Sequence, residues 1–272
     1  MKATSKVRDV FVLRLLLGMV LVLSVTPLHA AVKGEEVTYK AGDTVLKGYL
    51  AYDDAVKGKR PGVIVIHEWW GHNEFVRKRA RTLAELGYTA FAVDMYGDGK
   101  TVDHPDKAKA LMDATLGDAR RLHALYDAGL TVLKKHKTTD AKRIAAIGYS
   151  MGGRIVLQMA RDGADIAGVA NFYGSLGTNN SAEPGKVKAK ILVLNGADDP
   201  LVPPEAVEAF KKEMDAAKAD YKFVNYPGAK HCFAIPDVDV VGQKYNLPFA
   251  YHAEADRKSW AETQAFLKRI FR

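Results

Sequence analysis

The chain has 272 residues, of which 48% are hydrophobic and 26% charged, and its formal net charge is +8. This composition excludes an intrinsically disordered chain, because it supplies enough apolar surface for a core, and the length suits one domain. The densest basic run, at residues 77–81, lies in a segment whose apolar residues have helical spacing. We therefore expect a solvated helix face there and no nucleic-acid partner. The single cysteine, Cys232, excludes an internal disulfide.

Residues 1–30 differ in character from the rest of the chain. Basic residues precede an apolar stretch at residues 10–25, and small residues follow at Ala30 and Ala31. This pattern is typical of a signal peptide. The alternative is an uncleaved membrane anchor, but Arg14 interrupts the apolar run, which falls short of the roughly 20 residues that a spanning helix needs. We expect cleavage after residue 30, a secreted or periplasmic protein without a stable membrane span, and one domain at residues 31–272.

From residue 36 onward, short β-rich runs alternate with helical segments. The runs at 37–40 and 44–52 alternate their side chains and predict an edge hairpin, whereas later runs such as VIVIH at 63–67 are apolar on both faces. This order predicts an α/β fold with a mostly parallel, doubly wound, eight-stranded sheet. The predicted strands are 37–40, 44–52, 63–67, 90–94, 143–149, 168–172, 191–194 and 222–226, and the predicted helices are 76–86, 105–135, 152–161, 204–218 and 253–270.

The strongest local motif is GYSMGG at residues 148–153, between a predicted strand and a predicted helix. A nucleophilic serine in this context sits on a sharp turn, and the residues two before and two after it must lack a side chain. Gly148 and Gly152 meet this requirement around Ser150. A purely structural turn is the alternative interpretation. We expect Ser150 to be a nucleophile.

A serine hydroxyl needs a base within hydrogen-bond reach and an acid that orients the base. In folds that carry a nucleophile elbow, the chain order is serine, acid, histidine. The turn after the predicted strand 191–194 supplies Asp198 and Asp199, and we favour Asp199 as the acid. The loop after the last predicted strand supplies His231 as the base, with His252 as its rival in chain order.

A second group of candidates follows the predicted strand at 63–67. Backbone amides there can complete an oxyanion hole, and we expect Trp69 and Met151 to be the donors. His67, Glu68 and His72 look like a zinc motif, but the two histidines are five residues apart across a strand end and not four apart on a helix. We therefore expect no metal ion.

Together these motifs resemble the dienelactone hydrolase family, also called carboxymethylenebutenolidases. The matching segments, in chain order, are HEWWG, LAELGY, VDMYG, GYSMGG, GADDPLVPP and YPGAKHCF, and they extend over nearly all of residues 31–272. The resemblance implies an α/β-hydrolase fold with Ser150, Asp199 and His231 at the carboxyl edge of the sheet. It also implies that no cofactor is needed and that Glu68 lies at the active-site mouth, in contact with the resting nucleophile.

The chain departs from the family's founding members at three positions. It has Ser150 where they have cysteine, and Asp98 and Ile235 where they have arginines that bind a substrate carboxylate. Because an anion loses its water and gains no partner at such a site, we expect neutral esters or lactones to be preferred. Lys100 and Arg154 lie near the motifs and are alternative sources of a cation.

The sequence thus predicts a serine hydrolase that cleaves the ester or lactone bond of a small molecule through an acyl-enzyme on Ser150. One alternative is a small peptidase of the same fold, which would be expected to carry a large extra domain gating its site. The other alternative is a non-catalytic binding protein on a hydrolase scaffold, for which a broken triad would be the mark.

Overall fold

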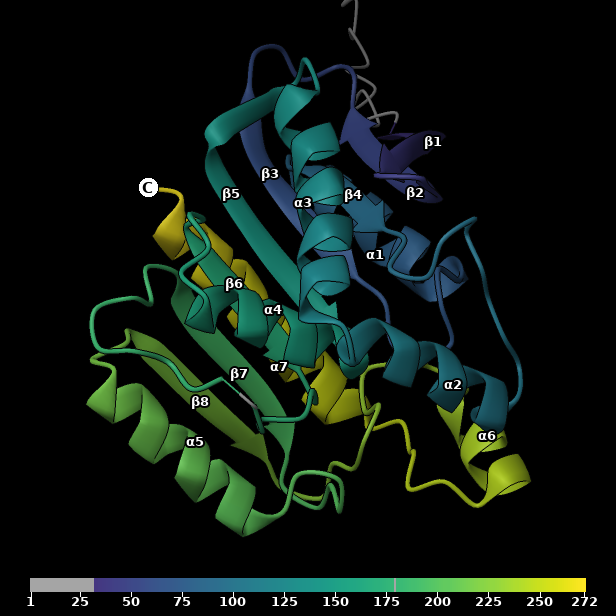
Figure 1. The fold of residues 1–272 in the computed structure, drawn as a ribbon, viewed down its shortest axis with the longest axis vertical. Helices are drawn as coiled ribbons and strands as arrows, with labels where there is room; N and C mark the ends of the chain where they lie inside the picture. Colours follow the sequence, from purple (N-terminus) through teal and green to yellow (C-terminus); the bar gives the residue numbers. More distant parts are fainter. Residues whose placement is uncertain (1–31, 179) are drawn as a thin grey trace, which may run out of the picture.

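An eight-stranded sheet forms the centre of the protein, and helices cover both of its faces (Figure 1). The computed structural model describes residues 32–178 and 180–272. The predicted signal peptide at residues 1–30 lies outside the described residues and stays a prediction. Within the described part, no helix combines the length and the apolar character needed to cross a membrane.

The strands follow the order β1-β2-β4-β3-β5-β6-β7-β8 across the sheet. All pairs from β4 to β8 are parallel, whereas β1 pairs antiparallel with β2 and β2 with β4. The prediction of a mostly parallel sheet with an edge hairpin is therefore confirmed. The strands are β1 (Val32–Ala41), β2 (Thr44–Asp53), β3 (Arg60–Ile66), β4 (Thr89–Val93), β5 (Thr139–Tyr149), β6 (Gly168–Phe172), β7 (Lys190–Gly196) and β8 (Tyr221–Tyr226).

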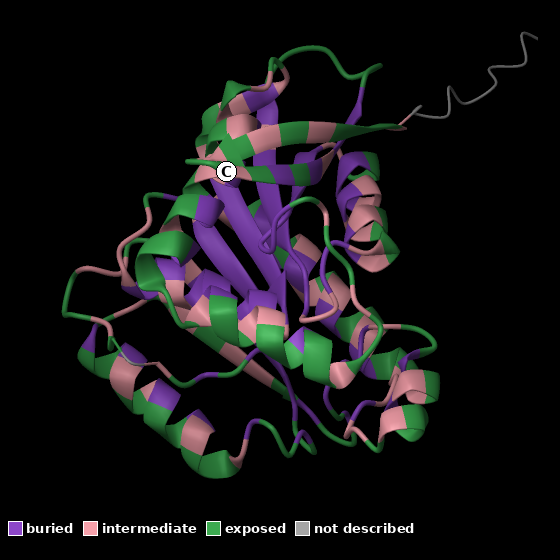
Figure 2. Ribbon diagram, turned by 45° about the vertical axis from the view of Figure 1, so that its right-hand side comes forward, coloured by how far each residue is buried: buried purple, intermediate pink, exposed green. Residues whose placement is uncertain are grey.

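The sheet divides the hydrophobic core into two parts, and helices cover each part. Apolar side chains of α3, α4 and α5 pack on one face, and those of α1 and α7 pack on the other. Figure 2 shows the central strands buried along most of their length, which explains why their sequences are apolar on both faces. The helices are α1 (Glu74–Glu85), α2 (Pro105–Leu116), α3 (Ala119–Lys135), α4 (Met151–Arg161), α5 (Pro204–Ala216), α6 (Val238–Tyr245) and α7 (Ala253–Ile270).

One helical prediction was wrong, and one helix was not predicted. The segment 105–135, predicted as one helix, is divided into α2 and α3, because Gly117 ends the first helix and the side chain of Asp118 accepts a hydrogen bond from the amide of Arg121 at 3.0 Å. Helix α6 was not predicted. It has only eight residues, and left-handed residues bound it at both ends, so its sequence has little helical periodicity to detect.

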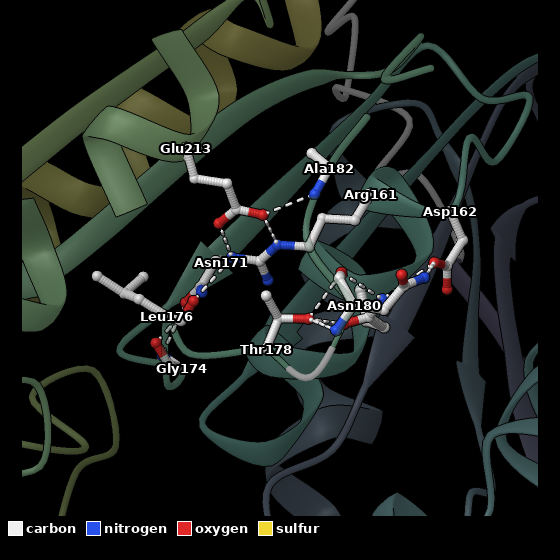
Figure 3. A network of polar contacts seen from close by, with 10 residues as sticks. Arg161, Asp162, Asn171, Gly174, Leu176, Thr178, Asn180, Ala182 and Glu213 are labelled. Carbon is white, nitrogen blue, oxygen red and sulfur yellow. Dashed lines mark hydrogen bonds and ion pairs between the residues drawn. The ribbon is translucent and has the colours of Figure 1, made fainter. Parts of the chain in front are cut away.

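A buried ion pair joins α4 and α5 to the loop that follows β6 (Figure 3). The guanidinium of Arg161 donates two hydrogen bonds to the carboxylate of Glu213, at 2.9 and 2.8 Å, and one to the carbonyl oxygen of Leu176 at 2.7 Å. Glu213 also accepts from the backbone amide of Ala182 at 2.9 Å. Because the loop carries Ser175, which lines the cavity described below, this network supports one wall of the site.

Replacing Glu213 should destabilise the fold far more than replacing a surface partner on the same helix. The Arg161 side chain is 1% exposed, so Glu213→Gln leaves a buried charge without its counterion and should lower the free energy of unfolding by about 3 kcal/mol. Glu208→Gln removes the partner of Lys211, whose side chain is 39% exposed, and should cost less than about 1 kcal/mol. Urea denaturation of the two variants checks this, and equal losses would contradict it.

Candidate active site

Ser150 lies in the turn between β5 and α4 with a left-handed backbone, at φ 50° and ψ −111°. A Cβ atom on Gly148 would lie 2.0 Å from the carbonyl oxygen of Gly152, and one on Gly152 would lie 2.4 Å from the carbonyl oxygen of Ile66. Neither position therefore accepts a side chain. The turn is strained at a non-glycine residue, as expected for a nucleophile elbow, and it directs Ser150 to the carboxyl edge of the sheet.

The structure brings Ser150, His231 and Asp199 together in one hydrogen-bonded chain. Ser150 Oγ lies 2.8 Å from His231 Nε2, and His231 Nδ1 lies 2.7 Å from Asp199 Oδ2. In the tautomer that suits a carboxylate at Nδ1, the imidazole donates to Asp199 and accepts the serine proton at Nε2. The side chains of His231 and Asp199 are almost fully buried, which excludes water from their contact.

Tertiary contacts separate the candidates that the sequence left as rivals. Asp198 is exposed, whereas Asp199 is buried and its second oxygen accepts from the amide of Leu201 at 2.9 Å. His252 caps α7 by accepting a hydrogen bond from the amide of Ala255 at 3.2 Å, so it lies apart from the serine. The geometry therefore selects Asp199 and His231.

Two aromatic rings hold the imidazole of His231 in place. The ring of Tyr173 lies 5.4 Å away, edge to face, and the ring of Phe249 lies 5.3 Å away at an angle of 33°. The backbone of Phe249 also pairs with that of His231 in an isolated parallel bridge. Phe249 was not predicted as a site residue, because no local pattern in the sequence shows that its loop returns to the histidine.

The predicted oxyanion-hole residues, Trp69 and Met151, both line the cavity that contains Ser150. The carbonyl oxygen of Trp69 accepts a hydrogen bond from the hydroxyl of Tyr96 at 2.8 Å, which orients the peptide. Within residues 32–178 and 180–272, neither backbone amide donates to a carbonyl oxygen of the chain. Met151 also begins α4, whose positive dipole end lies at this point. Both amides are thus available to an oxyanion.

The cavity at Ser150 has a volume of about 210 Å³. Trp69 lines it, whereas Trp70 lines a neighbouring cavity, and Phe172, Tyr173 and Phe233 are buried in the core. Most of the other lining residues are apolar. The full lining is Trp69, Met112, Leu116, Ser150, Met151, Arg154, Ser175, Leu201, Val202, His231 and Phe249.

The model of the dienelactone hydrolase family matches residues 46–271. The chain belongs to the dienelactone hydrolase family. It is similar to the solved structure named m3DLH, at 35% identity and a TM-score of 0.84, over 89% of this chain and 100% of that one. It is also similar to the dienelactone hydrolase-like promiscuous phosphotriesterase P91 from metagenomic libraries, at 30% identity and a TM-score of 0.82, over 89% and 99% of the two chains. A Methylorubrum extorquens protein named "Putative carboxymethylenebutenolidase" is 32% identical over 210 residues, which are 73% of this chain and 71% of that protein.

As a member of the dienelactone hydrolase family, the protein is a carboxylic ester hydrolase, and its substrate bond is an ester or a lactone. The predicted α/β-hydrolase fold is also confirmed by these neighbours. Family membership alone does not assign the roles of Ser150, Asp199 and His231, which rest on the distances above.

The contact that the family resemblance implies between Glu68 and the nucleophile is not found among the described residues. Glu68 does not line the Ser150 cavity; it lines the neighbouring cavity of about 450 Å³ and is 1% exposed. One carboxyl oxygen accepts from the side-chain amide of Asn73 at 2.5 Å, and the other is buried without a partner among the described residues. Burial raises the pKa of Glu68 to about 7, because the charged form loses its hydration. The hydroxyl of Ser150 contacts His231 instead.

The residues that resemble a zinc motif form hydrogen bonds within the chain. His67 Nδ1 contacts the carbonyl oxygen of Glu68 at 2.6 Å, and its Nε2 accepts from the amide of Met95 at 3.2 Å. Burial lowers the pKa of His67 to about 4, so its ring is neutral and acts as an acceptor. His72 Nε2 contacts the carbonyl oxygen of Ala92 at 3.0 Å. These contacts fix the loop that carries Trp69.

Asp98 and Ile235 stand where the family's founding members have arginines that bind a substrate carboxylate. Asp98 pairs with Lys47 at 2.7 Å, and its side chain is 65% exposed. Ile235 lines the neighbouring cavity with Glu68. Neither residue lines the Ser150 cavity, and the expected preference for neutral esters or lactones stays a prediction.

The raised pKa of Glu68 predicts a pH-dependent stability. Between pH 4.5 and about 7, the folded protein holds a proton on Glu68 that the unfolded chain releases. The stabilisation from this proton is therefore full below pH 4.5, falls as the pH rises and is lost above about 7. Glu68→Gln cannot titrate, so its stability relative to the wild type should rise between pH 4.5 and 8 by about 3 kcal/mol.

Urea denaturation at pH 4.5, 6 and 8 measures this difference, with Glu85→Gln as the control. Glu85 is exposed at the end of α1, so the difference between that variant and the wild type should stay constant. If the free energy of unfolding of Glu68→Gln differs from that of the wild type by the same amount at all three pH values, the Glu68 carboxyl is ionised in the folded protein. That result would contradict the prediction.

Proposed function

We propose that the protein hydrolyses small esters or lactones through an acyl-enzyme intermediate on Ser150. The observation that carries this proposal is the hydrogen-bonded chain from Ser150 Oγ through His231 to Asp199, with contacts of 2.8 and 2.7 Å. A serine hydroxyl becomes a useful nucleophile when a base accepts its proton and a buried carboxylate holds the base in the correct tautomer.

The first half of the reaction forms the acyl-enzyme. Ser150 Oγ attacks the acyl carbon as His231 Nε2 takes its proton, and the amides of Trp69 and Met151 donate hydrogen bonds to the oxyanion. The tetrahedral intermediate collapses when the C–O bond of the ester breaks and His231 returns the proton to the leaving oxygen. In a lactone, that oxygen remains tethered to the acyl group.

The second half repeats these steps with water. His231 removes a proton from a water molecule that attacks the acyl carbon, and the same amides stabilise the second oxyanion. Collapse then releases the carboxylic acid and returns the proton to Ser150. Asp199 stabilises the imidazolium in both halves, and the chemistry needs no bound cofactor.

The cavity favours small substrates, because its volume of about 210 Å³ lies below the usual range of drug-sized ligand pockets. This size favours a small ester over a peptide as the substrate. The hydrogen-bonded chain of Ser150, His231 and Asp199 favours an enzyme over a binding protein on the same scaffold, for which we expected a broken triad.

Ser150→Ala tests the proposal directly. The substitution removes the nucleophile while the glycines on both sides of the turn are retained, so kcat with p-nitrophenyl acetate should fall by several orders of magnitude and the fold should persist. A fluorophosphonate probe should label the wild type once and Ser150→Ala not at all, as read by intact-protein mass spectrometry. Activity of the variant within about tenfold of the wild type would place the nucleophile elsewhere.

A second prediction separates the two neighbouring aspartates. Asp199→Asn replaces the acceptor at His231 Nδ1 by an amide and should lower kcat by about 10⁴, because the imidazole then loses the tautomer that accepts the serine proton. Asp198→Asn, in the same turn but exposed, should lower kcat by less than about threefold. Steady-state kinetics of both variants give the ranking, and the reverse ranking would make Asp198 the acid.

A further inference from the structure

A second cavity adjoins the one that contains Ser150, and two side chains lie between them. Its volume is about 200 Å³, and that of the Ser150 cavity is about 210 Å³. Leu116, the last residue of α2, and Arg154, in the first turn of α4, line both cavities. Both residues are half-buried. Leu116 and Arg154 therefore form the partition between the two cavities.

The adjoining cavity has an apolar part that begins at the partition. Besides Leu116, the apolar residues that line it are Ala119 and Leu122 of α3 and Ile155 of α4. Leu116 itself packs against the hydrophobic core on this face of the sheet. The transfer of alkyl groups from water to such a surface is favourable. The cavity thus offers an apolar chain a place beyond the partition.

Polar side chains that line the adjoining cavity are engaged with one another. Asp162 accepts hydrogen bonds from Gln158 and Asn180, both at 3.0 Å, and lies 2.9 Å from the ring of His123. A half-buried arginine such as Arg154 can keep its charged end in water while its methylene groups contact an apolar neighbour. An alkyl chain in this cavity therefore deprives none of these polar groups of a hydrogen-bond partner.

The proposed mechanism places the acyl chain of the substrate next to the partition. His231 returns a proton to the leaving oxygen, so the alcohol group lies beside its imidazole. In the described part of the chain, His231 lines the Ser150 cavity and not the adjoining one. The acyl chain extends from the reacting carbon in another direction, where the remaining wall includes Leu116.

We propose that Leu116 is a specificity-determining residue that limits the length of the acyl chain, and that the adjoining cavity is a second acyl compartment which its side chain closes. The preferred substrates are then esters with a short acyl chain. A longer chain must displace the Leu116 side chain from its packing against the core. This inference rests on the proposed function and adds to it the basis of substrate choice.

The test compares two esters that share one leaving group, p-nitrophenyl butyrate and p-nitrophenyl octanoate, below the concentration at which the octanoate forms micelles. The quantity measured is the ratio of kcat/KM, octanoate over butyrate, in the wild type and in each variant. Intrinsic reactivity cancels when these ratios are compared between proteins.

In Leu116→Ala, the ratio should rise by about tenfold or more over that of the wild type, because the shorter side chain opens the partition. A methylene group that leaves water contributes roughly fourfold to affinity, and octanoate has several more of them than butyrate. Leu116→Val shortens the side chain less, so its ratio should lie between the two, and it decides the question if the alanine variant does not fold. Labelling by the fluorophosphonate probe shows that Ser150 is still reactive in each variant.

Two further variants show where the longer chain lies. Leu201→Ala is the matched control, since Leu201 is 51% exposed and, among the described residues, lines the Ser150 cavity without lining the adjoining one. Its ratio should stay within threefold of the wild type. Ala119 lines the adjoining cavity only, so adding Ala119→Phe to Leu116→Ala should fill the compartment and lower the ratio again by at least threefold.

A ratio within threefold of the wild type in both Leu116 variants, or an equal rise in Leu201→Ala, would overturn the role of Leu116. An unchanged ratio after the addition of Ala119→Phe would overturn the assignment of the adjoining cavity. In either case, hydrolysis by the wild type that is lost in Ser150→Ala would leave the proposed function standing. Failure of the proposed function would appear differently, as activity that survives in Ser150→Ala.

Discussion

The proposed mechanism depends on one strained turn, because the position of Ser150 follows from it. The turn needs a left-handed serine and close approach of the backbone on both sides, and Gly148 and Gly152 permit that approach. The strain is tolerated because the turn joins a buried strand to a buried helix, both packed in the core. The same turn directs the N-terminus of α4 and the amide of Met151 toward the site.

The remaining parts of the site lie at the ends of other strands, and the parallel sheet brings them together. Asp199 follows β7 and His231 follows β8, while the loop after β3 supplies Trp69. Because the carboxyl ends of parallel strands meet at one edge, short loops suffice to bring these residues within hydrogen-bond reach. The rings of Tyr173 and Phe249 then restrict the imidazole, so its orientation is set before a substrate binds.

Charge inside the site is distributed unevenly, and burial explains the distribution. Glu68 lines the neighbouring cavity, and its raised pKa of about 7 keeps part of it as the neutral acid at neutral pH. The half-buried side chain of Arg154 lines the Ser150 cavity. The carboxylate of Asp199 contacts the opposite side of the imidazole of His231 from Ser150.

The sequence by itself predicted the eight strands, four of the helices and the turn that carries Ser150, because strand alternation, helical spacing and turn glycines are properties of neighbouring residues. It also gave the order of acid and base. The sequence favoured Asp199 over Asp198, and the contact of Asp199 with His231 separates the two in the tertiary structure. The burial of Glu68 and the surface position of Asp98 were decided only by the tertiary structure. Each depends on which distant residues surround a side chain; Ser150 and His231, for example, are 81 residues apart. Local patterns carry no record of such contacts, since burial and ion pairing arise when the elements pack.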